Sequence, residues 1–199
     1  MITTTKHRRY EILIGLAFLM ATLTYSTGNG MITAALNTSA AGATGASVPA
    51  SGVLLELANS LMVIVAGCLT YAVLKTYDQS ILQGYQAVRI AEGLLLGIGA
   101  LLPLIMSHIA PTNLIAVRST LFNVSMVAFG AYSVYFCWFL LKQRLMYRVL
   151  TLVGMVGYVC LVLYSGMSAL GFSAPLWLFL PGALFELAYP MVLIFKGYR

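Results

Sequence analysis

The chain has 199 residues, of which 61% are hydrophobic and only 8% are charged, and its formal net charge is +6. Because a soluble domain carries about 25% charged residues, this composition excludes an ordinary soluble domain and indicates an integral membrane protein. The positive charge does not indicate nucleic-acid binding, because the Lys and Arg residues lie mainly in short segments between apolar runs, where they set membrane topology.

Six apolar stretches are long enough, or nearly long enough, to cross a bilayer, which takes roughly 20 residues of helix. They are residues 11–26, 53–76, 84–107, 117–141, 149–170 and 176–195. The first follows a basic segment as a signal peptide would, but no small-residue cleavage site closes it, so we expect an uncleaved span. The sequence therefore predicts an all-α, polytopic membrane protein, with six transmembrane helices in a single domain.

Basic residues flank the predicted spans at alternate ends. These residues are Lys6, Arg8, Arg9, Lys75, Lys142, Arg144, Arg148, Lys196 and Arg199. Six spans bring them all to one side of the membrane, which the positive-inside rule identifies as the cytoplasm, so both termini are predicted to be cytoplasmic. The segment 27–52 is rich in Ala, Gly, Thr and Ser, and we expect it to form a loosely structured outer loop.

The third predicted span carries two charged residues, Arg89 and Glu92, in an otherwise apolar run. Helical periodicity puts Gln86, Arg89, Glu92 and Gly93 on one face. A charged side chain near the bilayer centre costs at least about 2.5 to 3.5 kcal/mol, so this face is predicted to point inward, with Arg89 and Glu92 paired.

The sixth predicted span carries Glu186 near its middle. Arg89 would also reach Glu186 if the third and sixth helices touch. The predicted polar site consists of Arg89, Glu92, Glu186, Gln86 and Tyr189. Ionisable residues within a membrane indicate function by default, and the alternative is that these charges only lock the helices together.

A second, shallower polar cluster is predicted at the outer ends of the second and fourth spans. Glu56 and Arg118 form its charged part, with Asn59 and Asn123 beneath them. Long side chains near a span end also reach the interface by snorkelling, and for Glu56 and Arg118 this is the interpretation that we favour over a pair.

Neither a catalytic motif nor a metal or cofactor site is indicated. The motifs of metalloproteases, serine hydrolases, phosphate loops and dinucleotide-binding folds are all missing, so the catalytic residues stay unknown. The two histidines, His7 and His108, are predicted to lie on opposite sides of the membrane and cannot share a metal or haem. The three cysteines lie within apolar spans without a paired motif, and we expect them to be packing residues.

Four segments carry a family resemblance. They are ELANSLMVIVAGCLTYAVLKTYDQS, YQAVRIAEGLLLGIGALLPL, FLLKQRLMYRVLTLVGMVGYV and LPGALFELAYPMVLIFKGYR, and the most specific parts are the turn Arg89–Glu92 and the stretch Gly182–Glu186. With these segments the chain resembles the bacterial six-helix membrane proteins catalogued as domain of unknown function family 4386. The resemblance implies six helices in a bacterial cytoplasmic membrane, and it implies no activity.

Three functions are compatible with the sequence. The first is a protein that binds or moves a small amphipathic or lipophilic ligand in a cavity enclosed by the second, third, fourth and sixth helices. Arg89 would contact an anionic group of this ligand, and Glu92 and Glu186 a cation or proton. The second is a non-transporting accessory or regulatory subunit whose charges only fix the bundle. The expected partners are the lipid bilayer and a lipophilic small molecule, not nucleic acid.

The third possibility is an intramembrane enzyme that modifies a lipid or isoprenoid. It would use Glu92 or Glu186 as an acid or base. A second reactive group is then required within reach, and the candidates are Tyr132, Tyr158 and Tyr189.

Overall fold

The structure is a computed structural model that describes residues 2–41, 48–105 and 110–198, with side chains from residue 7 onward. These residues form six long helices, one short 3-10 helix and no strand, which confirms the predicted all-α fold. The helices are α1 (Ile2–Ala40), α2 (Ala50–Leu74), α3 (Gln79–Ile105), α4 (Pro111–Lys142), α5 (Arg148–Ala169), η1 (Leu176–Phe179) and α6 (Leu180–Phe195).

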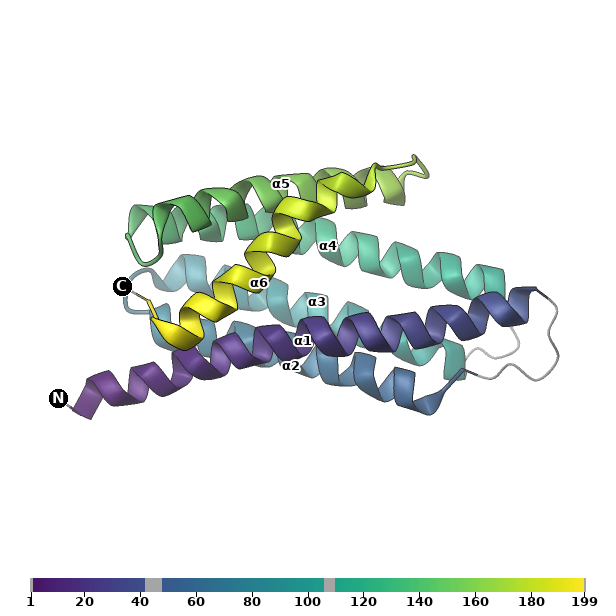
Figure 1. Ribbon diagram of the computed structural model, residues 1–199, viewed down its shortest axis with the longest axis horizontal. Helices are drawn as coiled ribbons and strands as arrows, with labels where there is room; N and C mark the ends of the chain where they lie inside the picture. The colour runs from purple at the N-terminus through teal and green to yellow at the C-terminus, as the bar shows by residue number, and fades with distance from the viewer. Residues whose placement is uncertain (1, 42–47, 106–109, 199) are drawn as a thin grey trace.

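The six helices form a closed ring in which each packs against the next (Figure 1). The ring closes where α6 packs against α1, and α1 also contacts α4 across the bundle. Among the described residues α3 and α6 do not pack against each other. This separation leaves space inside the bundle between the two helices that carry the predicted polar site.

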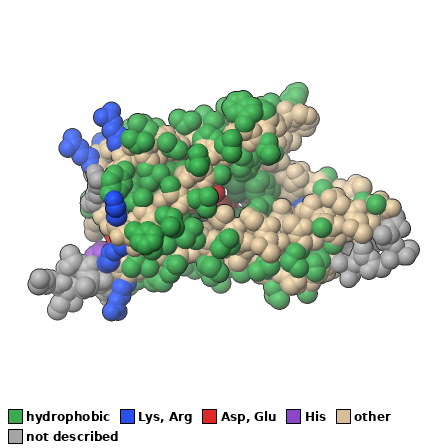
Figure 2. Space-filling model, in the orientation of Figure 1, with side chains coloured by type: hydrophobic (Ala, Val, Ile, Leu, Met, Phe, Trp, Pro, Cys, Tyr) green, Lys and Arg blue, Asp and Glu red, His purple; other side chains and the backbone are tan. Residues whose placement is uncertain are grey.

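The outer surface of the bundle is apolar over most of its length. Large hydrophobic side chains that are at least half exposed lie on several helices: Leu23, Leu54, Leu61, Leu94, Val156, Leu163, Leu184 and Leu187. Figure 2 shows such side chains over much of the visible face. A soluble monomer rarely exposes so much apolar surface, whereas lipid covers it at no cost. The fold is therefore that of a multi-pass membrane protein.

Both termini lie at one end of the bundle (Figure 1), and Lys and Arg side chains gather at this end in Figure 2. Three lysines there, Lys75, Lys142 and Lys196, lie 5.8, 5.0 and 5.1 Å from aromatic ring centres. Lysines beside Tyr and Trp are typical of a membrane interface. Arg199 lies outside the described residues. That this end is cytoplasmic stays a prediction of the positive-inside rule, and we call it the basic end.

The Arg8 side chain and the Tyr198 backbone amide hold the two ends of the chain together at the basic end. Arg8 donates a hydrogen bond of 2.6 Å to the carbonyl oxygen of Leu193 near the end of α6. The Tyr198 amide donates to Glu11, and the Tyr198 hydroxyl lies 2.6 Å from that of Tyr189. Burial raises the pKa of the Tyr198 hydroxyl above its ordinary value, so this group stays protonated near neutral pH. These contacts join α1 to the end of α6.

The predicted outer loop 27–52 is too long, because α1 continues as helix to Ala40 and α2 begins at Ala50. Residues 42–47 of this loop lie outside the described residues. With 39 residues α1 is about 58 Å long, roughly twice the hydrocarbon thickness of a bilayer. Its second half packs on α2, where the side chains of Ile32, Leu36 and Val53 are buried together.

Local and tertiary contacts explain why a Gly-, Ser- and Thr-rich segment is helical. The hydroxyl groups of Ser26 and Thr38 donate to the carbonyls four residues earlier, so they do not compete with the helix. Gly28 allows α1 to approach α2 closely, since a Cβ atom at this position would lie 2.8 Å from the carbonyl oxygen of Gly52. Composition indicates a loop here, and packing against α2 overrides it.

Other helix boundaries also differ from the predicted spans, and α1 already begins at Ile2, before the predicted residue 11. Helix α3 begins earlier, at Gln79, because the Asp78 side chain accepts a hydrogen bond from the Ile81 amide. Helix α4 begins earlier, at Pro111, where proline is favoured in a first turn. The predicted sixth span divides into η1 and α6. The last two residues of the predicted third span lie outside the described residues.

Two glycines of α1 provide a matched test of the close α1–α2 contact. Gly28→Ala is expected to lower the free energy of unfolding by about 1 to 3 kcal/mol, because its methyl group would overlap backbone atoms of α2. Gly30→Ala meets nothing within 4 Å and is expected to be neutral or to stabilise by up to about 1 kcal/mol. Thermal unfolding in detergent or nanodiscs measures both, and equal effects at the two positions would contradict this packing.

Candidate functional site

Arg89 and Glu92 form a buried ion pair within α3. The Arg89 Nη1 and Glu92 Oε2 atoms are 2.9 Å apart, and the two residues are only 4% and 5% exposed. Their spacing of three residues brings them together on one helix face. The predicted inward orientation and pairing of these charges are confirmed.

Aromatic side chains from three helices surround the Arg89 guanidinium. Its central carbon lies 4.0 Å from the ring centre of Phe129 on α4 and 4.6 Å from that of Phe18 on α1. Its Nε atom donates to the Tyr85 hydroxyl at 3.1 Å. Gly67 on α2 makes room for this arrangement, because a Cβ atom there would lie 2.5 Å from the Arg89 Cβ. Arg89 is therefore held by charge, hydrogen bonding and cation–π contact together.

A cavity of about 300 Å³ lies beside this ion pair, and we call it the inner cavity. Residues from all six helices line it, so α1 and α5 contribute in addition to the four helices predicted to enclose it. The lining includes Phe18, Tyr25, Asn59, Arg89, Glu92, Phe122, Leu161, Phe179, Ala183 and Glu186. The inner cavity thus brings together Arg89, Glu92 and Glu186, the three charged residues of the predicted site.

Glu186 lines the inner cavity without an ion pair or hydrogen bond to any described residue. The predicted bridge from Arg89 to Glu186 depends on contact between α3 and α6, and these helices do not pack on each other in the described part of the chain. The cavity occupies the space between them. Glu186 is half-buried, and its carboxylate is open to an occupant of this cavity.

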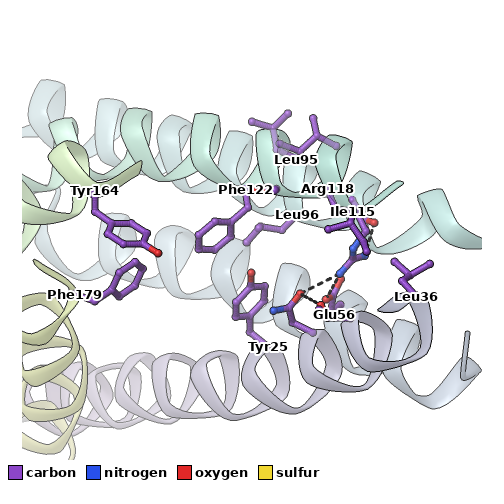
Figure 3. A pocket seen from close by; sticks show the side chains of 15 residues that line it. Tyr25, Leu36, Glu56, Leu95, Leu96, Ile115, Arg118, Phe122, Tyr164 and Phe179 are labelled. Carbon is purple, nitrogen blue, oxygen red and sulfur yellow. Dashed lines mark hydrogen bonds and ion pairs between the residues drawn. The ribbon is translucent and has the colours of Figure 1, made fainter. Parts of the chain in front are cut away.

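A second cavity, of about 390 Å³, lies toward the other end of the bundle, and we call it the outer cavity. Figure 3 shows Arg118 on α4 directed at Glu56 on α2. Their side chains are 2.6 Å apart, and the same guanidinium donates to Asn29 on α1 at 3.2 Å. Glu56 and Arg118 therefore form the outer pair, with Asn29 as an added partner, and the favoured interpretation that they snorkel to the interface is wrong.

Pro103 explains a further contact of Arg118. Proline has no N–H, so Pro103 leaves the carbonyl of Gly99, four residues earlier in α3, without its helical donor. The Arg118 Nη1 atom donates to this carbonyl oxygen at 2.6 Å. Arg118 therefore connects α1, α2, α3 and α4, and three of its five N–H donors have partners among the described residues.

The two cavities are neighbours that share four lining residues: Tyr25, Leu96, Phe122 and Phe179. The rings of Tyr25 and Phe122 are stacked with centres 5.5 Å apart, and they lie between the ends of the outer cavity in Figure 3. Figure 2 shows a hollow between α6 and the outer half of α1, with an acidic side chain visible inside it. The cavities therefore open sideways, on a face that lipid covers.

The other predicted site residues lie at different positions. Asn59 was assigned to the outer cluster but lines the inner cavity. Gln86 donates to the Cys68 sulfur at 3.3 Å, between α3 and α2. Tyr189 packs on Phe18 and hydrogen-bonds Tyr198, below the cavity.

Asn123 is buried and donates to Ser119 at 3.4 Å. Asn123, Gln86 and Tyr189 line neither cavity. His108 lies outside the described residues. Of the predicted site residues, Arg89, Glu92, Glu186 and Asn59 line the inner cavity, and Glu56 and Arg118 line the outer cavity.

Sequence reasoning missed the aromatic lining and Asn29. Asn29 lies in a segment that was predicted to be a loop. Had the first helix been predicted to continue past residue 26, Asn29 would have been expected on a helix near Glu56. Tyr85 is four residues before Arg89, so helical spacing alone was enough to find that partner. No local signal distinguishes Phe122 and Phe179, which line the cavities, from the many aromatic residues that face lipid or the core.

Comparison with known proteins agrees with this architecture. The sequence model of the family described as Domain of unknown function (DUF4386) matches residues 13–197. The chain belongs to this family. The match covers α1 from residue 13 and the whole of α2 to α6, and it includes every residue that lines the two cavities. No curated protein and no solved structure matches the chain.

A double-mutant cycle tests the contact between Arg118 and the Gly99 carbonyl. Arg118→Gln leaves the buried Glu56 carboxylate without its partner and is expected to cost about 3 to 5 kcal/mol of unfolding free energy. In a Pro103→Ala background the helix supplies its own donor to Gly99, so the same substitution is expected to cost about 1 kcal/mol less. Thermal or denaturant unfolding of the four proteins measures the coupling.

Glu56→Gln combined with Arg118→Gln serves as the control, because it removes both charges and is expected to recover part of the loss. Strict additivity of the changes at positions 103 and 118 would show that Arg118 does not replace the missing helical donor.

Proposed function

We propose that this membrane protein binds a small amphipathic or lipophilic molecule in the inner cavity. The observation that carries the proposal is the convergence of Arg89, Glu92 and Glu186 on one cavity of about 300 Å³ inside the bundle. Small-molecule sites are typically cavities of this size or larger, mostly apolar, with a few convergent polar groups. Ionisable residues within a membrane most often serve a ligand, a proton or a substrate path.

The position of the cavity supports a ligand that arrives from the bilayer. The hollow in Figure 2 lies on a side face of the bundle, between α1 and α6. Movement of a ligand across the membrane would also require the basic end to open, where Arg8 and Tyr198 join the two ends of the chain. Binding is therefore the function that these contacts support best. We also propose the bacterial cytoplasmic membrane as its location, with the basic end inside.

An accessory or regulatory subunit is the second candidate. The Arg89–Glu92 pair supports it, because a buried pair can serve packing alone. A pair that serves packing alone requires neither a cavity nor a second glutamate, Glu186, on the wall of that cavity. The two functions differ in a measurable way, since only a binding protein gains stability from a specific molecule.

An enzyme receives less support from the same geometry. Tyr132 donates its hydroxyl to the Ile81 carbonyl, Tyr189 is bonded to Tyr198, and Tyr158 packs between Phe129 and Phe185. None of these three tyrosines lines either cavity. The second reactive group that a glutamate would need is therefore not among the predicted candidates.

A substitution that fills the inner cavity tests the proposed function. Ala183 lines the cavity and is exposed at its edge, so Ala183→Leu adds bulk there without overpacking a core. We expect the variant to fold normally and to lose most of the stabilisation by amphiphiles that bind the unchanged protein. A ligand at 100 times its Kd stabilises by about 2.7 kcal/mol, which thermal unfolding in nanodiscs detects across a panel of lipids and amphiphilic compounds.

Ala128→Leu is the matched control, because Ala128 is an exposed residue of α4 that lines neither cavity. This variant is expected to keep the ligand response of the unchanged protein. A panel with no stabilising compound, or an equal response in all three proteins, would refute the proposed site and favour an accessory role.

A further inference from the structure

We propose that the ligand of the inner cavity is a lipophilic cation, whose positively charged group binds beside Glu186. This inference rests on the proposed function and names its ligand class. The sequence alone leaves both signs open, because Arg89 would suit an anionic group and the glutamates a cationic one. The geometry of the cavity distinguishes these two possibilities.

The charge of the Arg89 guanidinium is already paired, although only two of its five N–H donors are bonded to described residues. Its charge is paired with Glu92 at 2.9 Å, and its Nε atom is bonded to Tyr85. Phe129 and Phe18 lie against it at 4.0 and 4.6 Å, where they restrict approach to the planar group. An anion at the remaining donors would share the Arg89 charge with Glu92 and would lie in a cavity that a second carboxylate, Glu186, also lines, so its own charge would be poorly compensated.

Glu186 is in the opposite situation. It lines the same cavity, and no described residue forms an ion pair or hydrogen bond with its carboxylate. Because Arg89 and Glu92 cancel, the formal charge of the three groups is −1. An uncompensated carboxylate among apolar groups is costly, and a cationic ligand would supply the missing partner.

The remaining lining suits the rest of such a ligand. Tyr25, Phe122 and Phe179 line both cavities, and aromatic rings attract cations as well as apolar groups. A cation with an apolar tail partitions into the bilayer and would reach Glu186 through the hollow between α1 and α6 (Figure 2). The chemistry that fits is a quaternary ammonium or protonated amine group joined to an aromatic or alkyl portion.

Three probes of similar shape test the charge preference in nanodiscs. They are 4-phenylbutyltrimethylammonium, its uncharged analogue with a tert-butyl group in place of trimethylammonium, and 4-phenylbutanesulfonate. Their affinities for the full chain are measured from ligand-dependent thermal stabilisation. We expect the unchanged protein to bind the ammonium probe most tightly. Glu186→Gln is expected to weaken ammonium binding by about tenfold or more, to the level of the uncharged analogue, whose own binding stays unchanged.

Glu11→Gln is the matched control, since it makes the same substitution at the basic end, away from both cavities. It is expected to keep the preference for the ammonium probe. If Glu186→Gln does not fold, the order of the three affinities in the unchanged protein decides, together with Glu186→Asp, which keeps the charge and should keep that order.

The outcomes separate this inference from the proposed function. Equal binding of the three probes, or preference for the sulfonate, would overturn the cationic ligand while leaving a binding cavity in place, provided that Ala183→Leu abolishes the binding. An ammonium affinity that Glu186→Gln does not change would overturn the role of Glu186. Failure of all three probes to bind the unchanged protein would overturn both proposals.

Discussion

The structure depends on one constraint, which is that a charged side chain within the bilayer requires a compensating partner. Arg89 meets this requirement through the carboxylate of Glu92, the hydroxyl of Tyr85 and the rings of Phe18 and Phe129. These partners come from α1, α3 and α4, so stabilising one guanidinium brings three helices to fixed positions. The apolar outer faces then follow, because the polar face of each helix is already used inside the bundle.

The same constraint is met in two different ways along the bundle. Arg118 reaches Glu56, Asn29 and the Gly99 carbonyl that Pro103 leaves free, so this outer group is closely bound to protein. The inner group contains one carboxylate more than its arginine can balance, and Glu186 is the unmatched member. We interpret the outer group as structural and the inner group as the proposed ligand site. The outer group fixes four helices, and the inner group is open to a ligand.

Helical periodicity and the cost of buried charge were enough to predict the six spans and their inward faces. On α2 the two predicted polar residues, Glu56 and Asn59, are both buried. The order of helices around the ring was not predictable, because no residue pattern states that α3 and α6 are separated, and the distance of Glu186 from Arg89 depends on this. The helical continuation of α1 was also missed, since contacts such as Gly28 against Gly52 exist only after packing.

The most direct test of this account is an experimentally determined structure of the protein in lipid nanodiscs, at a resolution that shows side chains and bound molecules. The account predicts that the Arg89 guanidinium lies between Phe18 and Phe129 and is paired with Glu92. It also predicts density for a bound molecule beside Glu186, in the cavity between α3 and α6. Arg89 directed outward to lipid, or α6 packed against α3 with no space between them, would contradict it.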